Sequence, residues 1–216
     1  MTDISETFIE SYKNGSVCLH PAGTLYGLTC DPFSEIAMKR VYEIKQRPRQ
    51  KPLIYLSSSY EKALNFWDNL PGLWAEALKE VWPEHLTVLW RVKAGKSQLI
   101  SHTDSLIGIR VPRYDEPSWF ERVLQKLDHP TPTTSINYSG TPSLRLRCEV
   151  TRFCRKHQVF FFEKDGGLDA PENSLLPSTI IKIADETSYK LVRNGAFDHQ
   201  HLSTFGLKFL KNGDSE

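Results

Sequence analysis

The sequence has few features that would mark a secreted, membrane-spanning or metal-binding protein. No apolar run approaches the roughly 20 residues of a membrane helix, and the N-terminal stretch carries Asp3, Glu6 and Glu10 where a signal peptide needs an apolar core. The 4 cysteines show no CxxC spacing and the 7 histidines form no HExxH motif. We therefore expect a cytoplasmic protein with free thiols and no structural metal site.

The common nucleotide-binding and hydrolase motifs are also missing. Gly95-Lys96-Ser97 resembles the end of a P-loop, but Trp90 stands where that motif needs its first glycine. Without that glycine turn, no ring of backbone N–H groups can cradle phosphates. The chain contains neither GxGxxG nor GxSxG. A nucleotide site in this chain must therefore be built from other segments.

Charge of one sign does not dominate the chain, since the formal net charge is only +1. This balance argues against a polycation that binds nucleic acid with its whole surface. Cations do gather locally, however. One basic stretch contains Lys45, Arg47, Arg49 and Lys51, and a second contains Arg145, Arg147, Arg152, Arg155 and Lys156. Such patches attract phosphate groups without making the protein basic.

Short apolar segments alternate with helical patterns along nearly the whole chain. Strands are expected at residues 16–19, 52–56, 86–92, 106–111, 159–162, 178–183 and 189–193, and a further strand is expected to end in Thr133–Ser135. Helices are expected at residues 4–13, 34–47, 60–67, 74–81, 119–127 and 144–156, the second capped by Ser34. This order predicts a single α/β domain with a mixed sheet over residues 1–197, followed by a peripheral C-terminal tail at 198–216.

The segment Ile44–Leu56 joins a helix end to a buried strand through cations and two prolines. The prolines stiffen the turn, which lowers the entropy lost when side chains converge on a polyanion. Arg47 offers a planar fork for two phosphate oxygens, whereas Lys45 acts as a point charge. Cations also favour helix C-termini, so a solvated helix end remains an alternative for this segment.

Four further segments place polar side chains in or next to expected strands. The segment 133–143 offers Ser135 and Asn137, either as ligand donors or as a turn that caps the next helix. The remaining candidates are Thr24 and Tyr26 in HPAGTLYGL, Arg110 in GIRVP, and Ser178, Thr179 and Arg193 in PSTIIKI and LVRNGAF. Arg110 lies inside an apolar strand and therefore needs an internal acid or a bound carboxylate.

Together these segments resemble the YrdC/TsaC family of threonylcarbamoyl-AMP synthases, with the motifs in family order from about Ser16 to Phe197. The family's Lys-x-Arg and Ser-x-Asn pairs correspond to Lys45-Gln46-Arg47 and Ser135-Ile136-Asn137. Its Pro-x-x-Thr-x-Tyr-Gly-Leu segment corresponds to residues 21–28. The stretches 51–53, 108–112, 177–180 and 191–195 occupy the other family positions.

The resemblance implies an α/β domain whose twisted sheet, flanked by helices, surrounds an open basic cavity. It implies synthesis of L-threonylcarbamoyladenylate from L-threonine, bicarbonate or CO2, and ATP with Mg2+, for modification of tRNA. The implied catalytic set is Lys45, Arg47, Ser135 and Asn137, and the implied nucleotide-binding set adds Lys51, Ser178 and Arg193. Thr24, Tyr26, Arg110 and Thr134 would bind threonine, with Arg110 on its carboxylate. Proteins that transfer the threonylcarbamoyl group to tRNA would be downstream partners.

The chain departs from the family pattern at Ala22, Gly23, Glu84 and His85, positions that concern the amino-acid pocket more than the phosphates. Two other functions fit some of the same features. One is a non-enzymatic module that binds double-stranded or ribosomal RNA with the basic stretches, although the chain lacks an aromatic-rich RNA motif. The other is the related domain of hydrogenase maturation proteins, which normally comes with further domains.

Overall fold

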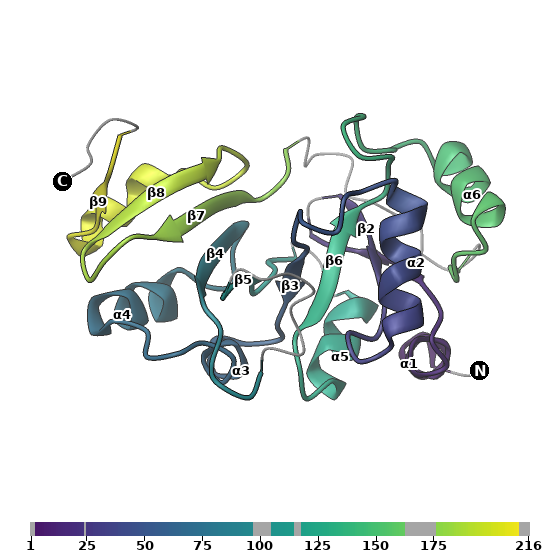
Figure 1. Ribbon diagram of the computed structural model, residues 1–216, viewed down its shortest axis with the longest axis horizontal. Coiled ribbons are helices and arrows are strands. Elements are labelled where there is room, and N and C mark those ends of the chain that lie inside the picture. The colour runs from purple at the N-terminus through teal and green to yellow at the C-terminus, as the bar shows by residue number, and fades with distance from the viewer. Residues whose placement is uncertain (1–2, 24, 97–104, 115–117, 163–175, 212–216) are drawn as a thin grey trace.

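The computed structural model describes residues 3–23, 25–96, 105–114, 118–162 and 176–211, and its strands form one mixed sheet. The strands lie in the order β1-β2-β6-β3-β5-β4-β7-β8-β9 (Figure 1). Their bounds are β1 Cys18–Pro21, β2 Tyr26–Thr29, β3 Ile54–Leu56, β4 Leu86–Arg91, β5 Leu106–Arg110, β6 Thr131–Ser135, β7 Thr179–Ile183, β8 Ser188–Arg193 and β9 Lys208–Phe209. This twisted mixed sheet, flanked by helices, confirms the α/β fold expected from the sequence.

Strand β3 lies near the middle of the sheet, where parallel and antiparallel pairing meet. It pairs in parallel with β5 and antiparallel with β6, so that Ile54 lies opposite both Gly108 and Thr133. The pairs β4–β7 and β8–β9 are also parallel. Because crossovers separate these parallel strands, segments far apart in sequence meet along neighbouring strand ends.

Helices cover the sheet at both ends (Figure 1). Their bounds are α1 Ile4–Lys13, α2 Glu35–Lys45, α3 Tyr60–Leu64, α4 Gly72–Val81, α5 Trp119–Lys126, α6 Arg147–Lys156 and the 3-10 helix η2 His199–Phe205. Ser34 caps α2 as expected, since its Oγ accepts the N–H of Ala37 at 3.2 Å. Gln46 ends α2 in the left-handed region, with φ of 50°. Among the described residues, no helix has the length and apolar character needed to span a bilayer.

The core consists of three apolar clusters. Helices α3, α4 and η2 pack with β4, β5 and β7 around the fully buried Trp74. Helices α2 and α6 pack with β2, and helices α1 and α5 form the third cluster around Phe8 and Phe120. Three of the cysteines lie in this core as free thiols, and the fourth, Cys148, is exposed. The expectation of free thiols is confirmed for all four.

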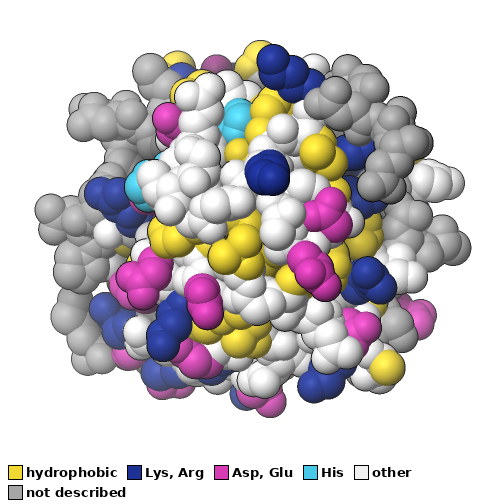
Figure 2. Space-filling view, turned by 90° about the vertical axis from the view of Figure 1, so that its left-hand side faces the viewer, with side chains coloured by type: hydrophobic (Ala, Val, Ile, Leu, Met, Phe, Trp, Pro, Cys, Tyr) yellow, Lys and Arg dark blue, Asp and Glu magenta, His cyan; other side chains and the backbone are white. Residues whose placement is uncertain are grey.

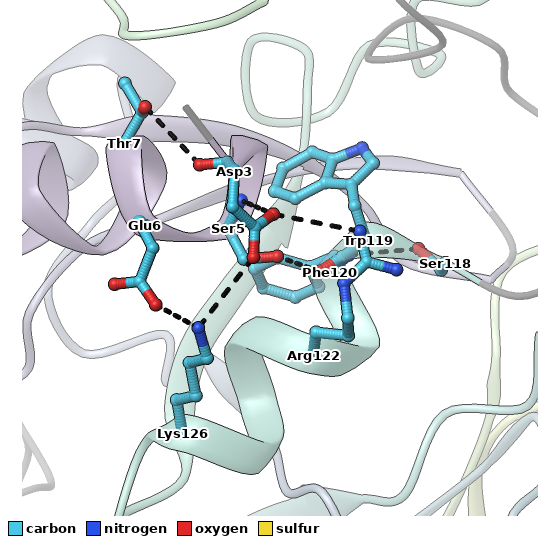
Figure 3. Close-up of polar contacts among 9 residues, drawn as sticks. All are labelled: Asp3, Ser5, Glu6, Thr7, Ser118, Trp119, Phe120, Arg122 and Lys126. Atoms are coloured by element: carbon cyan, nitrogen blue, oxygen red, sulfur yellow. Dashed lines mark hydrogen bonds and ion pairs between the residues drawn. The ribbon is translucent and has the colours of Figure 1, made fainter. Parts of the chain in front are cut away.

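Charged and polar contacts join the start of α1 to α5 at the surface (Figure 3). Lys126 pairs with Glu6 and lies 3.9 Å from an Asp3 carboxylate oxygen, while Arg122 lies 4.0 Å from the other. Ser5 donates its hydroxyl hydrogen to the Trp119 carbonyl at 3.3 Å. We call this set the α1–α5 contact. On the face that Figure 2 shows, basic and acidic side chains are similarly interspersed among apolar ones.

Two sequence-based expectations were wrong, and two strands, β2 and β9, were not foreseen. Residues 159–162 form only an isolated bridge, in which Phe160 pairs with Cys18, and not a strand. Part of the expected C-terminal tail is packed and not peripheral, because Leu202 and Leu207 are buried and β9 pairs with β8. These expectations were based on local apolar patterns, whereas a segment forms a strand only where an edge of the sheet is available for pairing. Strand β2 begins within the segment HPAGTLYGL, for which no strand was expected.

Candidate functional site

A cavity of about 650 Å³ opens between the ends of β2, β3 and β6 on one side and β7 and β8 on the other. Nine of the predicted site residues line it: Tyr26, Arg47, Lys51, Arg110, Thr134, Ser135, Asn137, Ser178 and Arg193. Thr24 lies outside the described residues. Thr179 is fully buried beneath the cavity wall and donates its hydroxyl hydrogen to the Phe197 carbonyl at 2.6 Å. Five separate parts of the chain, at residues 26, 47–51, 110, 134–137 and 178–193, therefore meet around one hollow.

Arg47 is held over the cavity by the backbone of its own loop. Its Nε donates to the Lys51 carbonyl at 3.1 Å, and its Nη2 donates to the Pro52 carbonyl at 2.9 Å. These bonds use part of the guanidinium fork and fix its direction, while the rest of the group faces the cavity. Partial burial lowers the Arg47 pKa from its usual value. The stiff turn predicted from Pro48 and Pro52 thus holds a cation in place.

Lys45 lies behind the cavity wall and is only 1% exposed. Its Nζ donates to the Ser135 carbonyl and, at 2.5 Å, to the Asn137 side-chain oxygen. The Ser135 hydroxyl donates to the same Asn137 oxygen at 2.7 Å, and the Asn137 amide donates to the Thr141 carbonyl at 2.5 Å. Lys45 therefore fixes the Ser-x-Asn turn from below. Burial, followed by repulsion from Arg47, lowers the Lys45 pKa to about 7.

Arg193 closes the opposite wall together with Ser178. Its Nε and Nη2 donate to the Ser178 carbonyl at 3.0 and 2.8 Å, and Nη2 also reaches the Ser178 hydroxyl at 3.1 Å. Gly195 allows the chain to pass this close, since a Cβ there would lie 2.2 Å from the Pro177 carbonyl oxygen. Burial lowers the Arg193 pKa, and the charge of Arg47 lowers it further. The two guanidinium groups therefore repel each other across the cavity.

Arg110 lies at the deep end of the cavity and is 2% exposed. Its Nη2 donates to the Ala22 carbonyl at 2.6 Å. Burial lowers the Arg110 pKa to about 10, so the side chain stays charged at neutral pH. A buried guanidinium at a cavity wall is well placed for a small carboxylate. Tyr26 and Thr134 line the same cavity.

The electrostatics of the cavity favour an anion. Its described lining includes Arg47, Lys51, Arg110, Arg145 and Arg193, and no aspartate or glutamate. The polar partners of Arg47 and Arg193 in the described residues are neutral carbonyl and hydroxyl oxygens. Like charges held by neutral oxygens in a partly desolvated cleft, as at Arg47 and Arg193, raise the local potential and attract phosphate or carboxylate groups. The expected open basic cavity is consistent with this lining.

Sequence reasoning missed several residues of this site. Arg145 belongs to the second basic stretch but received no role, although it lines the cavity together with Thr141 and Thr133. His20 and Gly27 lie in the segment that supplied Tyr26 and were also passed over. His20 lies within β1 and is fully buried, and a histidine next to an apolar segment was the available signal.

Metal binding has little support from the side chains themselves. In the described ranges, no group of three or more His, Cys, Asp and Glu side chains comes together as a metal site. The cavity instead offers hydroxyl, amide and cationic groups. A Mg2+ ion at this cavity would therefore rely on oxygen ligands from a bound phosphate compound.

Comparisons with known proteins agree with the motifs. Residues 10–195 match the family Sua5_yciO_yrdC, described as "Telomere recombination". A protein from Photobacterium profundum named threonylcarbamoyl-AMP synthase is 28% identical over 176 residues, which cover 78% of this chain and 91% of that protein.

Solved structures agree with the fold. Sua5 from P. abyssi in complex with L-threonine aligns with a TM-score of 0.76 at 22% identity, covering 98% of this chain and 62% of that one. The chain therefore spans about three fifths of that Sua5 protein. E. coli YciO aligns with a TM-score of 0.75 at 20% identity, covering 90% of each chain. At these identities, the likeness to solved structures establishes the fold alone.

Proposed function

The chain belongs to the Sua5/YciO/YrdC family, and on that premise we propose that it forms L-threonylcarbamoyl-AMP and pyrophosphate from L-threonine, bicarbonate or CO2, and ATP. The relatives named threonylcarbamoyl-AMP synthase support this activity. The observation that carries the proposal is the single cavity in which Arg47, Ser135 and Arg193 surround space for a triphosphate while Arg110 lies deeper. The reaction is a nucleotidyl transfer that needs both an anion cradle and a carboxylate partner.

The nucleotide phosphates are proposed to lie between the two walls. Arg47 and Arg193 would bind phosphate oxygens from opposite sides, which removes their mutual repulsion. The Ser135 hydroxyl and the Asn137 amide lie on the β6 side, in the position fixed by Lys45. Lys51 and Ser178 complete the lining. Fixed donors such as the two guanidinium groups and the second N–H of the Asn137 amide stabilise charge that develops during phosphoryl transfer, because they need no reorganisation.

The amino acid is proposed to bind at the deep end, with its carboxylate on Arg110 and with Thr24, Tyr26 and Thr134 around it. The amine would add to CO2 and lose a proton to give a carbamate, whose oxygen attacks the α-phosphorus of ATP and expels pyrophosphate. No side chain has to form a covalent intermediate. Holding the carbamate and the nucleotide together supplies much of the rate, because the encounter becomes intramolecular.

Mg2+ is proposed to enter with ATP. The phosphates would supply most of its ligands, as is common for Mg2+ at nucleotide sites, and the ion would neutralise charge on the leaving pyrophosphate. Within the chain, Ser135 and Asn137 offer oxygen atoms near this position. We further propose that the protein acts in the cytoplasm and supplies its unstable product to proteins that transfer the threonylcarbamoyl group to tRNA.

The test is pyrophosphate release by the purified chain with ATP and Mg2+. We expect release only when both L-threonine and bicarbonate are present, and mass spectrometry should detect threonylcarbamoyl-AMP. Release that is absent, or unchanged when threonine is withheld, contradicts the enzyme. Salt-dependent RNA binding without turnover would instead favour the RNA-binding alternative, whose support is the basic stretch in α6.

A further inference from the structure

His20 and Thr133 meet directly above the backbone of Gly27, at the edge of the cavity. His20 Nε2 lies 2.8 Å from Thr133 Oγ1. A Cβ on Gly27 would lie 2.5 Å from that nitrogen and 2.7 Å from that hydroxyl oxygen. The missing side chain of Gly27 therefore leaves the space in which a histidine from β1 and a threonine from β6 reach each other across β2.

The surroundings of His20 allow only one tautomer. Its Nδ1 lies 3.0 Å from the Pro21 carbonyl oxygen, which can only accept, so Nδ1 carries the hydrogen. His20 is fully buried and stacks on Phe120 at 4.1 Å between ring centroids. Burial lowers the His20 pKa to about 3, so the ring stays neutral and Nε2 keeps a lone pair.

The hydroxyl of Thr133 is therefore the donor in its bond to His20. It has one hydrogen, and that hydrogen points at Nε2. Thr133 lines the cavity while only 4% exposed, so any contact of its hydroxyl with a ligand there is made through the lone pairs of its oxygen. A hydroxyl normally rotates to suit its partner, but this one is restricted to accepting hydrogen bonds on its cavity side.

The sheet register places this acceptor on the same face of the sheet as Arg110. Ile54 lies opposite both Thr133 and Gly108, and Leu56 lies opposite Arg110 one pleat further along. Thr133 and Arg110 therefore project from the same face of the sheet, on the two strands that flank β3, and the charge of Arg110 also acts on His20. A cation for a carboxylate and an acceptor for an amine thus line the same cavity, which matches the two polar ends of an α-amino acid.

We propose that His20 is a positioning residue that turns the Thr133 hydroxyl into an acceptor, and that Thr133 receives an N–H of the substrate amino group. This inference rests on the proposed function and assigns the amine contact within it. With one N–H held by Thr133, a neutral amine has its lone pair directed elsewhere and open to CO2. The same arrangement disfavours ligands that carry an acceptor at this point, because they would face the lone pairs of Thr133.

The first test measures L-threonine affinity by calorimetry with a non-hydrolysable ATP analogue present. Thr133→Val removes the acceptor and is expected to weaken L-threonine binding about tenfold, whereas Thr133→Ser keeps the wild-type affinity. His20→Phe frees the hydroxyl to rotate and is expected to weaken binding severalfold. The glutamine of His20→Gln can accept from Thr133 and donate to Pro21, so this variant should bind L-threonine with nearly the wild-type affinity. Affinity for the ATP analogue alone should stay unchanged in all four variants.

The second test needs no substitution. In protein labelled with 15N-histidine, the His20 ring should show hydrogen on Nδ1 and none on Nε2 from pH 5 to pH 8. An Nε2–H tautomer, or L-threonine affinity in folded Thr133→Val equal to the wild type, overturns the inference while leaving the enzyme proposal intact. Failure of the wild-type protein to bind L-threonine at all overturns both.

Discussion

Cations gather at two places in this molecule, and their partners differ. In the α1–α5 contact, Lys126 and Arg122 face the carboxylates of Asp3 and Glu6, with all four side chains largely exposed. In the cavity, Arg47 and Arg193 are held by neutral carbonyl oxygens and repel each other. Charges at the first place are balanced within the chain. Those at the second are oriented but not balanced, which is the state expected of groups that bind an anion.

The comparison predicts the largest effect for loss of a cavity cation. Arg47→Ala should weaken ATP binding about a hundredfold, since charge-assisted hydrogen bonds contribute about 1.5–3 kcal/mol each. Equilibrium binding of a labelled ATP analogue measures this. Arg122→Ala, in the α1–α5 contact, is the matched control and should bind ATP as the wild type does. Equal ATP affinity in the two folded variants would show that the cavity cation contributes no more to ATP binding than a cation of the α1–α5 contact.

A second effect concerns the pH dependence of stability. The Lys45 pKa is about 7 in the folded state, against 10.5 for the ordinary side chain. Between these values the unfolded chain binds more protons, so the free energy of unfolding should rise with pH by up to about 1.4 kcal/mol per unit. Below pH 7 both states are protonated and the full burial cost remains.

Lys45→Met removes this titration while keeping an unbranched side chain of similar length. Urea unfolding at pH 7, 8 and 9 should therefore show the wild type gaining stability relative to the variant as pH rises. The corresponding change in the α1–α5 contact, Lys126→Met, should give a pH profile parallel to that of the wild type over this range. Parallel profiles for Lys45→Met would show that the folded-state pKa of Lys45 is not depressed.

The smallest effect is expected at the α1–α5 contact itself. Lys126→Ala should lower the melting temperature by no more than about 3 °C, because exposed ion pairs contribute little and long side chains lose entropy in forming them. The loss should shrink further at 1 M NaCl, where the Debye length is about 3 Å. Calorimetry at low and high salt measures both values. A large, salt-independent loss would mean that Lys126 acts through packing.

Local sequence patterns predicted the elements well where a segment depends mainly on itself. Helix α2 is capped by Ser34 and ends before Pro48, because a side-chain cap and a proline act within one turn. Local patterns failed at residues 159–162, since pairing of that segment depends on the sheet edge beside Cys18. They also failed at Leu202, whose burial depends on a surface formed by distant strands.

The candidate site shows the same division. Residue types and spacing were enough to single out Lys45, Arg47, Ser135 and Asn137, and to favour phosphate chemistry, since a fork, a point charge and small polar donors are local properties. The different roles of Lys45 and Arg47 came only from the tertiary structure, which buries one behind the wall and turns the other into the cavity. Likewise, only the sheet register brings His20 to Thr133 over Gly27. Burial and hydrogen-bond direction depend on neighbours about a hundred residues away, and those neighbours are set by strand order.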